Sequence, residues 1–304
     1  MEIPYTISAR PDTGLYNGKL GIWLFLASEV MLFGALFTSY LFMRLGADDG
    51  TWPQHVLDVR LGLLNTAILI ISSITMVYAW VALKERKLGL FRVYLGVTII
   101  CGVAFLSVKA YEYYTKYEHW GLLIKEDKFA QYEDQLKKMD VEVTPIPSQH
   151  VVQITGDLED WKPGPDGNYY ETVPQTGFTG NYVLTPIKNF HPFGYKSPEG
   201  EKQTSGAEAP KDEETITIAG DDVERAGRFL PYYGTYFAIY FTVTGLHALH
   251  IIGGVIVMLY FLTVGSNLYK RSPEQLANRI EVTGIFWHFV DLVWITVFPI
   301  LYLT

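Results

Sequence analysis

The sequence predicts an all-α integral membrane protein with five transmembrane helices and a mixed extramembrane insert between the third and fourth helices. Three observations predict this class. Hydrophobic residues make up 49% of the 304 residues, and aromatic residues make up 15%. The apolar residues gather in five long runs, and about 20 such residues cross the roughly 30 Å hydrocarbon layer as a helix. Residues 115–228 form a separate, more polar stretch.

The five runs contain very few charged residues. The first holds only Glu29, the third holds only Lys109 and Glu112, the fifth holds only Asp291, and the other two hold none. Buried core helices of a soluble protein are the alternative, which runs of this length and purity disfavour. The runs are residues 20–43, 61–83, 93–114, 229–269 and 282–304.

The chain therefore divides into three parts. Residues 1–114 hold a polar N-terminal tail and helices one to three, residues 115–228 form the insert, and residues 229–304 hold helices four and five. The tail has no cleavable signal pattern, so we expect the first helix to be retained as a span. The links after helices two and four are basic, which predicts that they face the cytoplasm. The N-terminus is then cytoplasmic, and the C-terminus and the insert are external.

The insert combines several local patterns. Phe129, Tyr132, Leu136 and Met139 recur at spacings of three and four, which predicts a short amphipathic helix. The segments VEVTPIP and NYVLTPI predict strands bounded by Pro and Gly. Aromatic residues are absent from 196–226, where Pro, Gly, Ser and acids dominate, so we expect a flexible linker there.

Five polar residues stand inside the apolar runs, and we call them the intramembrane polar cluster. Glu29 lies in LASEVMLFGALF, where a carboxylate costs several kcal/mol unless it is neutral or paired. GLHALHIIGG places His247 and His250 three residues apart on one helix face, and FWHFVDLVW does the same for His288 and Asp291. At about 1.5 Å of rise per residue, we expect Glu29 to share a layer with His250 and with the pair in helix five.

Three interpretations of this cluster are open. The simplest is hydrogen bonding between helices, which fixes their packing. A second adds a tuning role in proton handling beside a partner subunit, because an acid beside imidazoles can stay protonated or be held ionised by a histidinium. The third makes the histidines haem or copper ligands, which is disfavoured because helices one to three contain no histidine.

Five stretches of the sequence, taken together and in order, resemble subunit III of haem–copper terminal oxidases in its short, five-helix bacterial form. They are SEVMLFGALF, LLNTAILIISSITM, KAYEYY, GLHALHIIGG and IEVTGIFWHFVDLVWI. The insert departs from this family, which usually has a short external loop at that point. The resemblance implies a subunit of the bacterial inner membrane that carries no redox metal, with haem and copper held by subunits I and II. It also implies bound phospholipids and a supporting role in proton uptake during reduction of oxygen to water.

The resemblance also assigns residues. Glu29 matches the family's membrane glutamate, and the remaining matches lie in the Glu-Tyr motif, the histidine pair and the last helix. Local chemistry offers simpler explanations for two of the acids, since Glu112 follows Lys109 by three residues and Glu281 lies near the expected start of helix five. The remaining matched residues are Glu112, His247, His250, Glu281, His288 and Asp291.

The electron donor stays open at this point. Cytochrome c is the expected donor, while a quinol oxidase or a nitric oxide reductase accessory subunit would share the five-helix plan. A stand-alone transporter or proton channel is disfavoured because no inverted repeat is visible. The insert holds 21 acidic and 12 basic residues, whereas the rest of the chain holds 11 and 12. Residues 115–228 are therefore a candidate contact for a basic cytochrome c or a partner respiratory complex, or simply a solvated surface; no nucleic acid is expected as a partner.

Overall fold

The computed structural model divides the chain into two compact units. The helical unit comprises Met1–Gly46, Val59–Ala110 and Ile239–Thr304, and the insert unit comprises Ala47–Asp58 and Tyr111–Ala238. The structure describes residues 17–47, 52, 57–118, 120–138, 144–146, 151–162, 181–186, 216–228 and 234–303.

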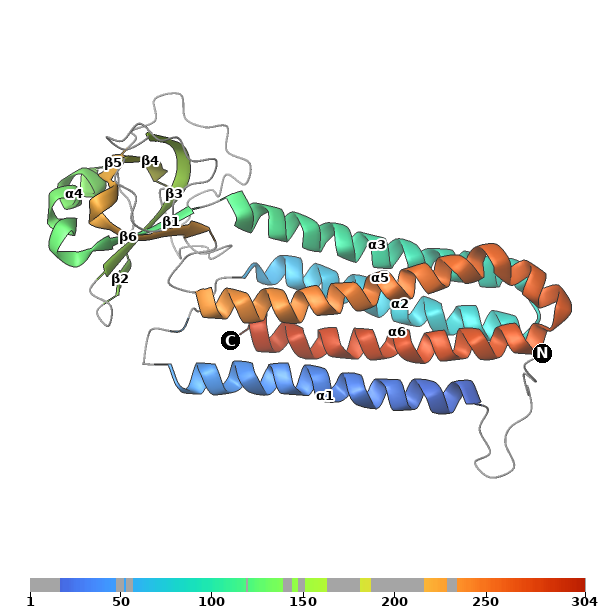
Figure 1. Cartoon of the computed structure of the whole chain (residues 1–304). Coiled ribbons are helices and arrows are strands. Elements are labelled where there is room, and N and C mark those ends of the chain that lie inside the picture. The colour runs from blue at the N-terminus through green and yellow to red at the C-terminus, as the bar shows by residue number, and fades with distance from the viewer. Residues whose placement is uncertain are drawn as a thin grey trace. The chain divides into compact units, whose positions relative to one another are not determined.

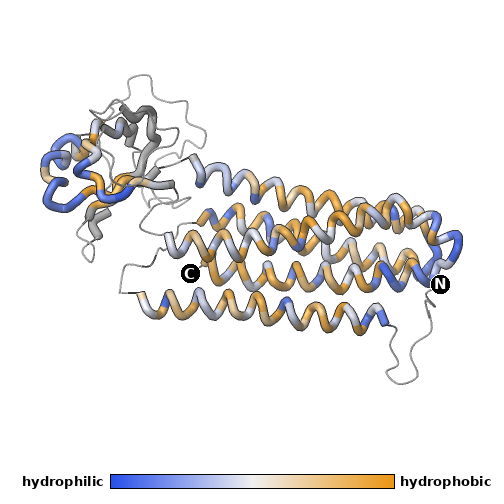
Figure 2. Tube along the Cα trace, viewed as in Figure 1, coloured by the Kyte–Doolittle hydropathy of each residue, from blue (hydrophilic) through white to orange (hydrophobic). Residues whose placement is uncertain are grey.

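Five long helices confirm the five predicted spans (Figure 1). Each is long and apolar enough to cross a membrane, and Figure 2 shows apolar residues along their lengths with hydrophilic residues gathered at the end where α5 turns into α6. The chain is therefore a multi-pass membrane protein. The helices are α1 (Asn17–Leu45), α2 (Val59–Lys84), α3 (Leu88–Glu118), α5 (Gly234–Arg271) and α6 (Pro273–Tyr302).

Helix α6 lies at the centre of the packing. A Cβ atom added to Gly62 of α2 would lie 2.7 Å from the Phe298 ring, so only glycine allows this approach of α2 to α6. Trp287 of α6 is enclosed in the same way between Gly102 of α3 and Gly254 of α5. Helix α1 is more peripheral, because its buried side chains, at Leu26, Phe33 and Tyr40, recur only every seven residues.

The link between α5 and α6 is a single residue. The Ser272 side chain caps α6 by accepting a hydrogen bond from the Gln275 backbone N–H, and Pro273 opens the helix. Glu281 therefore lies in the third turn of α6. The expectation that this acid lies at the helix N-terminus is wrong, because the helix begins eight residues before it.

Among its described residues, the insert unit contains an antiparallel sheet and the helix α4, besides the adjoining ends of α3 and α5. The strand order is β5-β4-β3-β1-β6, and β2 pairs with β3. The elements are β1 (Trp120–Lys125), α4 (Glu126–Lys138), β2 (Thr144–Ile146), β3 (Val151–Lys162), β4 (Asn181–Pro186), β5 (Ile216–Ala219), η1 (Gly220–Asp222) and β6 (Val223–Arg228).

The predicted amphipathic helix is confirmed as α4. Phe129, Tyr132 and Leu136 pack on a core that includes Leu122 and Ile154 of the sheet, whereas Met139 lies outside the described residues. The Tyr132 hydroxyl donates a hydrogen bond to the Asp222 carboxylate at 2.7 Å, which ties α4 to η1. Burial is the largest cause that raises the pKa of Tyr132.

The predicted strands are confirmed within VEVTPIP and NYVLTPI, which contribute β2 and β4. The linker prediction is wrong for residues 216–226. There, ITIA alternates buried and exposed side chains as β5, and β6 follows after one turn of 3-10 helix. Short strands of Ile, Thr, Val and Ala need no aromatic residues, so the loss of aromatics did not indicate a linker at this point. Residues 196–215 of the predicted linker lie outside the described residues.

Candidate functional site: polar residues in the helical unit

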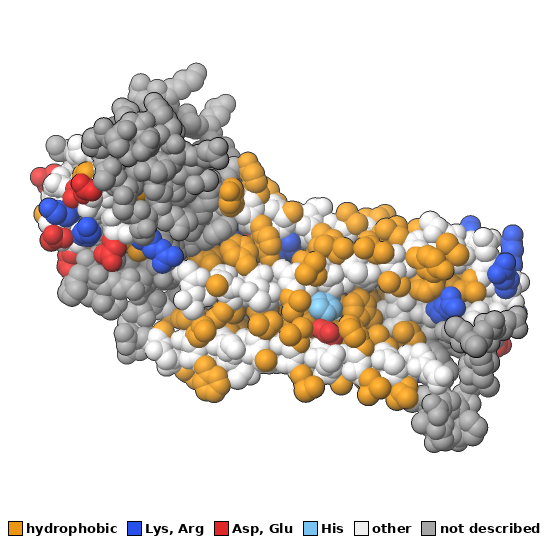
Figure 3. Space-filling view, in the orientation of Figure 1, with side chains coloured by type: hydrophobic (Ala, Val, Ile, Leu, Met, Phe, Trp, Pro, Cys, Tyr) orange, Lys and Arg blue, Asp and Glu red, His pale blue; other side chains and the backbone are white. Residues whose placement is uncertain are grey.

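Glu29 of α1 and His250 of α5 form a direct pair, as predicted from their depth. Glu29 Oε2 lies 3.0 Å from His250 Nε2, and each side chain is 13% exposed. The rings of Phe33 and Phe286 lie 5.5 and 6.2 Å from the imidazole. Figure 3 shows an acidic and a histidine side chain side by side amid apolar surface on the helices. The pair therefore sits in apolar surroundings at the rim of the unit.

The contact of His250 Nδ1, the second ring nitrogen, indicates how many protons the Glu29–His250 pair holds. His250 Nδ1 lies 2.8 Å from the Leu246 carbonyl oxygen, which can only accept a hydrogen bond, so Nδ1 carries a hydrogen. One further proton in the contact between Nε2 and Glu29 then satisfies both groups. It resides either on the carboxyl or on the imidazole, and the pair as a whole is neutral in both cases.

His288 and Asp291 face a different neighbour. Ser73 Oγ of α2 lies 2.6 Å from His288 Nδ1, and Asp291 is buried beside the same serine. Near Phe33 of α1, the neighbour from α6 is aromatic, since the Phe289 ring lies 6.4 Å from that of Phe33. The structure therefore separates the predicted cluster into a Glu29–His250 pair and a Ser73–His288–Asp291 group.

His247 is enclosed by aromatic rings. Its side chain is 1% exposed, and its ring lies 5.5 Å from that of Phe105 and 5.2 Å from that of Trp294. Trp294 donates from Nε1 to Thr66 Oγ1 at 3.1 Å. Neither ring nitrogen of His247 has a hydrogen-bond partner in the part of the chain that the structure describes.

Lys109 was not among the predicted site residues, although it is buried close to His247. Its ammonium donates to the hydroxyls of Tyr240 and Tyr302, at 3.0 and 2.8 Å. It also lies 5.3 Å from the centre of the Trp294 ring, a cation–π contact. Two features of the sequence could have indicated this site. One is a lysine inside an apolar run, and the other is the presence of tyrosines in other helices whose hydroxyls can accept hydrogen bonds from it.

The two family-matched acids form ion pairs. Glu112 accepts from Lys116 at 2.8 Å, four residues further along α3, and both side chains are buried. The sequence suggested Lys109 as a local partner of Glu112, and the structure shows Lys116 in an ion pair with it. Glu281 pairs with Lys19 at 2.6 Å and so joins α6 to α1.

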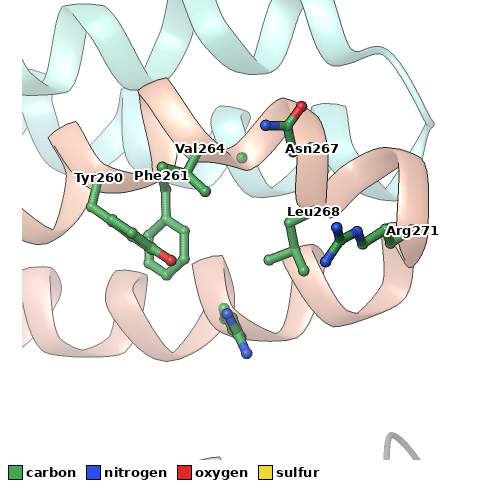
Figure 4. A pocket seen from close by; sticks show the side chains of 8 residues that line it. Tyr260, Phe261, Val264, Asn267, Leu268 and Arg271 are labelled. Carbon is green, nitrogen blue, oxygen red and sulfur yellow. The ribbon is translucent and has the colours of Figure 1, made fainter.

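A cavity of about 310 Å³ lies where α5 ends and α6 begins (Figure 4). Tyr260, Phe261 and Leu268 contribute apolar surface, and Arg271 and Arg279 bring guanidinium groups from the two helices. Because guanidinium groups bind phosphate with two parallel hydrogen bonds, such a cavity can hold a phosphate group whose substituent is apolar.

Metal ligands do not gather anywhere in the described ranges. There, no three His, Cys, Asp or Glu side chains lie close enough to hold a metal ion. The absence of a metal in this chain stays a prediction.

The similarity of this chain to known proteins covers its five long helices. The family described as cytochrome c oxidase subunit III matches residues 11–118 and 227–304, which is more than half of the chain. The chain belongs to the cytochrome c oxidase subunit III family. The matched ranges contain all five helices, together with Glu29, His250 and the other site residues, and they leave out most of the insert.

Curated relatives within the family carry two kinds of name. Cytochrome c oxidase subunit 3 of Bacillus subtilis (strain 168) is 34% identical over 122 residues, 39% of this chain and 59% of that protein. A probable quinol oxidase subunit 3 of Staphylococcus saprophyticus is 34% identical over 118 residues, 38% of this chain and 58% of that protein. The chain thus spans about three fifths of the length of these two relatives.

A third relative is similar over nearly the whole chain. It is a heme-copper oxidase subunit I+III of Aeropyrum pernix, 23% identical over 291 residues, which are 94% of this chain and 22% of that protein. Because so little of the chain is left uncovered, the alignment runs through the insert.

Proposed function

We propose that this chain is the non-catalytic subunit III of an aerobic haem–copper terminal oxidase of the bacterial inner membrane, which reduces oxygen to water. The observation that carries this proposal is the family match across all five helices. The redox metals belong to subunits I and II, and this chain packs against subunit I. A relative that fuses subunits I and III supports this partner.

Cytochrome c is the proposed donor, because the insert carries 21 acidic and 12 basic residues and would complement a basic docking face. Quinol is the second candidate, since a quinol oxidase subunit is as similar to this chain as a cytochrome c oxidase subunit. A purified complex that oxidises reduced cytochrome c but no quinol supports the first donor. Oxidation of quinol alone supports the second.

The Glu29–His250 pair is the proposed contribution to proton uptake. It holds one proton between two groups at 3.0 Å, at a partly exposed position in an apolar layer. Moving that proton between the two groups changes no net charge, so the low dielectric opposes the transfer less than it opposes creation of a lone charge. The pair can thus shift a proton between carboxyl and imidazole without a change of net charge, and it passes a proton on when one proton enters the pair as another leaves it.

The cavity with Arg271 and Arg279 is the proposed phospholipid site. Basic cavities between membrane helices bind anionic head groups, and the apolar wall formed by Tyr260 and Leu268 suits acyl chains. Replacing both arginines by glutamine should reduce retention of phosphatidylglycerol or cardiolipin, measured by mass spectrometry of the purified protein. Equal loss of zwitterionic lipid would contradict a charge-specific site.

Purification in mild detergent tests the main proposal. A tagged chain should bring haem-containing partners in fixed ratio, and the subunit freed of those partners should show neither a haem spectrum nor bound copper. Isolation of the chain alone, without haem, from cells that respire aerobically would contradict an oxidase subunit. A stoichiometric metal in the freed subunit would contradict its non-catalytic role.

A further inference from the structure

Apart from the half-buried Trp80 indole, three almost fully buried polar side chains of the helical unit have no hydrogen-bond partner in the described part of the chain. They are the amide of Asn65, both ring nitrogens of His247 and both carboxyl oxygens of Asp291. Their exposed fractions are 0%, 1% and 5%. Ser73 lies beside Asp291 and contacts His288 Nδ1 at 2.6 Å, where its hydroxyl can donate or accept, but no hydrogen bond to either Asp291 oxygen meets the geometric limits. Buried polar groups are nearly always satisfied, and internal water satisfies those that protein atoms do not.

His247 lies near Trp294 of α6, Asp291 lies on the same helix, and Asn65 lies on the segment of α2 that contacts this tryptophan. The His247 ring lies 5.2 Å from the Trp294 ring. The indole N–H donates to Thr66, the chain neighbour of Asn65 on α2. Asp291 precedes Trp294 by three residues, so the two share a face of α6. The three unsatisfied groups therefore come from the segments of α2, α5 and α6 that lie near Trp294.

Polar contacts continue from this region in both directions along α6. Lys109 binds the Tyr302 hydroxyl at one end, and Ser73 binds His288 at the other. At 1.5 Å of rise per residue, the segment from His288 to Tyr302 covers about 21 Å, a large part of a hydrocarbon layer roughly 30 Å thick. Phe286 packs on His250, so it lies on the side of α6 toward the Glu29–His250 pair.

We propose that Asn65, His247 and Asp291 bind internal water between α2, α5 and α6, and that Asp291 holds a proton which exchanges through this water. The site is separate from Glu29 and rests on the helical unit alone, so it does not depend on the proposed oxidase function. Water is the ligand that fits, because it both donates and accepts hydrogen bonds. The amide, the imidazole and the carboxyl together require both.

Infrared spectroscopy of the full chain, in the complex in which it purifies, tests this proposal. The carboxyl band of Asp291 is the band that disappears in Asp291→Asn. We expect this band to be present in the unmodified protein and to shift within minutes of transfer to D2O. Absence of the band, or a band that stays unshifted for hours in folded protein, would overturn the proposal. Where Asp291→Asn fails to assemble, the band cannot be assigned, and a cryo-EM map of the unmodified protein decides instead.

A second variant addresses the water itself. Asn65→Leu removes one of the groups that hold water and should slow the exchange at Asp291 by about fivefold to tenfold, the rate equivalent of roughly one hydrogen bond. Thr38→Val is the matched control, because Thr38 is exposed on α1 and bonds only the Gly34 carbonyl of its own helix. Exchange that is equally fast in Asn65→Leu would overturn the role of Asn65.

A cryo-EM map that resolves internal water provides the direct check. Density is expected about 3 Å from the Asn65 amide and from His247 or Asp291. Direct hydrogen bonds among the three side chains, with no water between them, would overturn the proposal.

Discussion

At the scale of single residues, the membrane carboxylates differ in how they are satisfied. Glu29 shares a proton with His250, whereas Asp291 lies beside a serine that is already engaged with His288. The first arrangement ties the peripheral helix α1 to α5, and the second lies between α2 and α6. Replacing Glu29 should therefore affect the docking of α1 more than the packing of the other four helices.

Glu29→Gln should preserve assembly and reduce sustained turnover. The glutamine amide can donate to His250 Nε2 and so keep the contact, but it cannot hold a transferable proton. Glu29→Leu leaves the imidazole without this partner and should weaken docking of α1 by about 1 to 2 kcal/mol. Activity over many turnovers and subunit retention in detergent measure the two effects. Normal sustained turnover in Glu29→Gln would argue against a role in proton uptake.

The sequence predicted the depth of these residues in the membrane, but it did not predict which neighbouring helix each side chain faces. Apolar runs and a fixed rise per residue place Glu29 and His250 at similar depth, and the pair follows from that count. The same count places His288 and Asp291 in that layer, yet they face α2. Which side of α6 meets which neighbour depends on close packing, as between Gly254 and Trp287, and the helical pattern of one segment does not contain this information.

At the scale of elements, glycines decide how closely helices approach Trp287. A Cβ at Gly254 would lie 2.9 Å from the Trp287 ring, whose N–H is held by Ser72 at 3.0 Å. Gly102 approaches the same six-membered ring, and a Cβ there would lie 3.0 Å from it. The contact between α5 and α6 therefore tolerates little added volume.

Gly254→Ala should lower the thermal stability of the helical unit, with an overpacking cost of about 1 to 3 kcal/mol that exceeds the gain of about 1 kcal/mol in helix propensity. Gly253→Ala is the matched control on the next residue, where a Cβ meets no atom within 4 Å. The control should be neutral or slightly stabilising. Thermal unfolding in detergent compares the two variants, and equal melting temperatures would refute the steric argument.

The insert unit should lose stability in alkaline solution. Burial raises the pKa of Tyr182 on β4 to about 12, so the folded unit retains a proton that the unfolded chain releases near pH 10. The resulting stabilisation is complete below pH 10 and is lost as pH rises toward 12. Tyr182→Phe keeps the ring and should flatten this part of the pH dependence, measured by hydrogen exchange of β3 and β4. An unchanged profile in the variant would assign the effect to other groups.

At the scale of the whole molecule, charge is distributed unevenly. The insert carries a net charge of −9 and the remaining chain a net charge of +1. Part of the expected linker belongs to strands β5 and β6, so deletion of residues 196–226 would damage the sheet. A test of electrostatic steering must therefore be confined to residues 196–215, which hold six acidic and three basic residues.

Replacing residues 196–215 by an uncharged Gly/Ser segment of equal length should slow electron entry from a basic cytochrome c at low ionic strength. The difference should fade as ionic strength approaches about 0.15 M, where the Debye length is roughly 8 Å. Stopped-flow reduction of the oxidase at several salt concentrations measures the effect. Rates that match the unmodified protein across this range would rule out steering by this segment.

The single residue between α5 and α6 has a consequence for biogenesis. With only Ser272 between them, the 38 residues of α5 and the 30 residues of α6 leave the ribosome as two hydrophobic helices joined by a tight reversal, which is charged at Lys270, Arg271 and Glu274. Neither helix can move laterally into lipid far from the other. The insertion machinery must therefore receive the two as a hairpin.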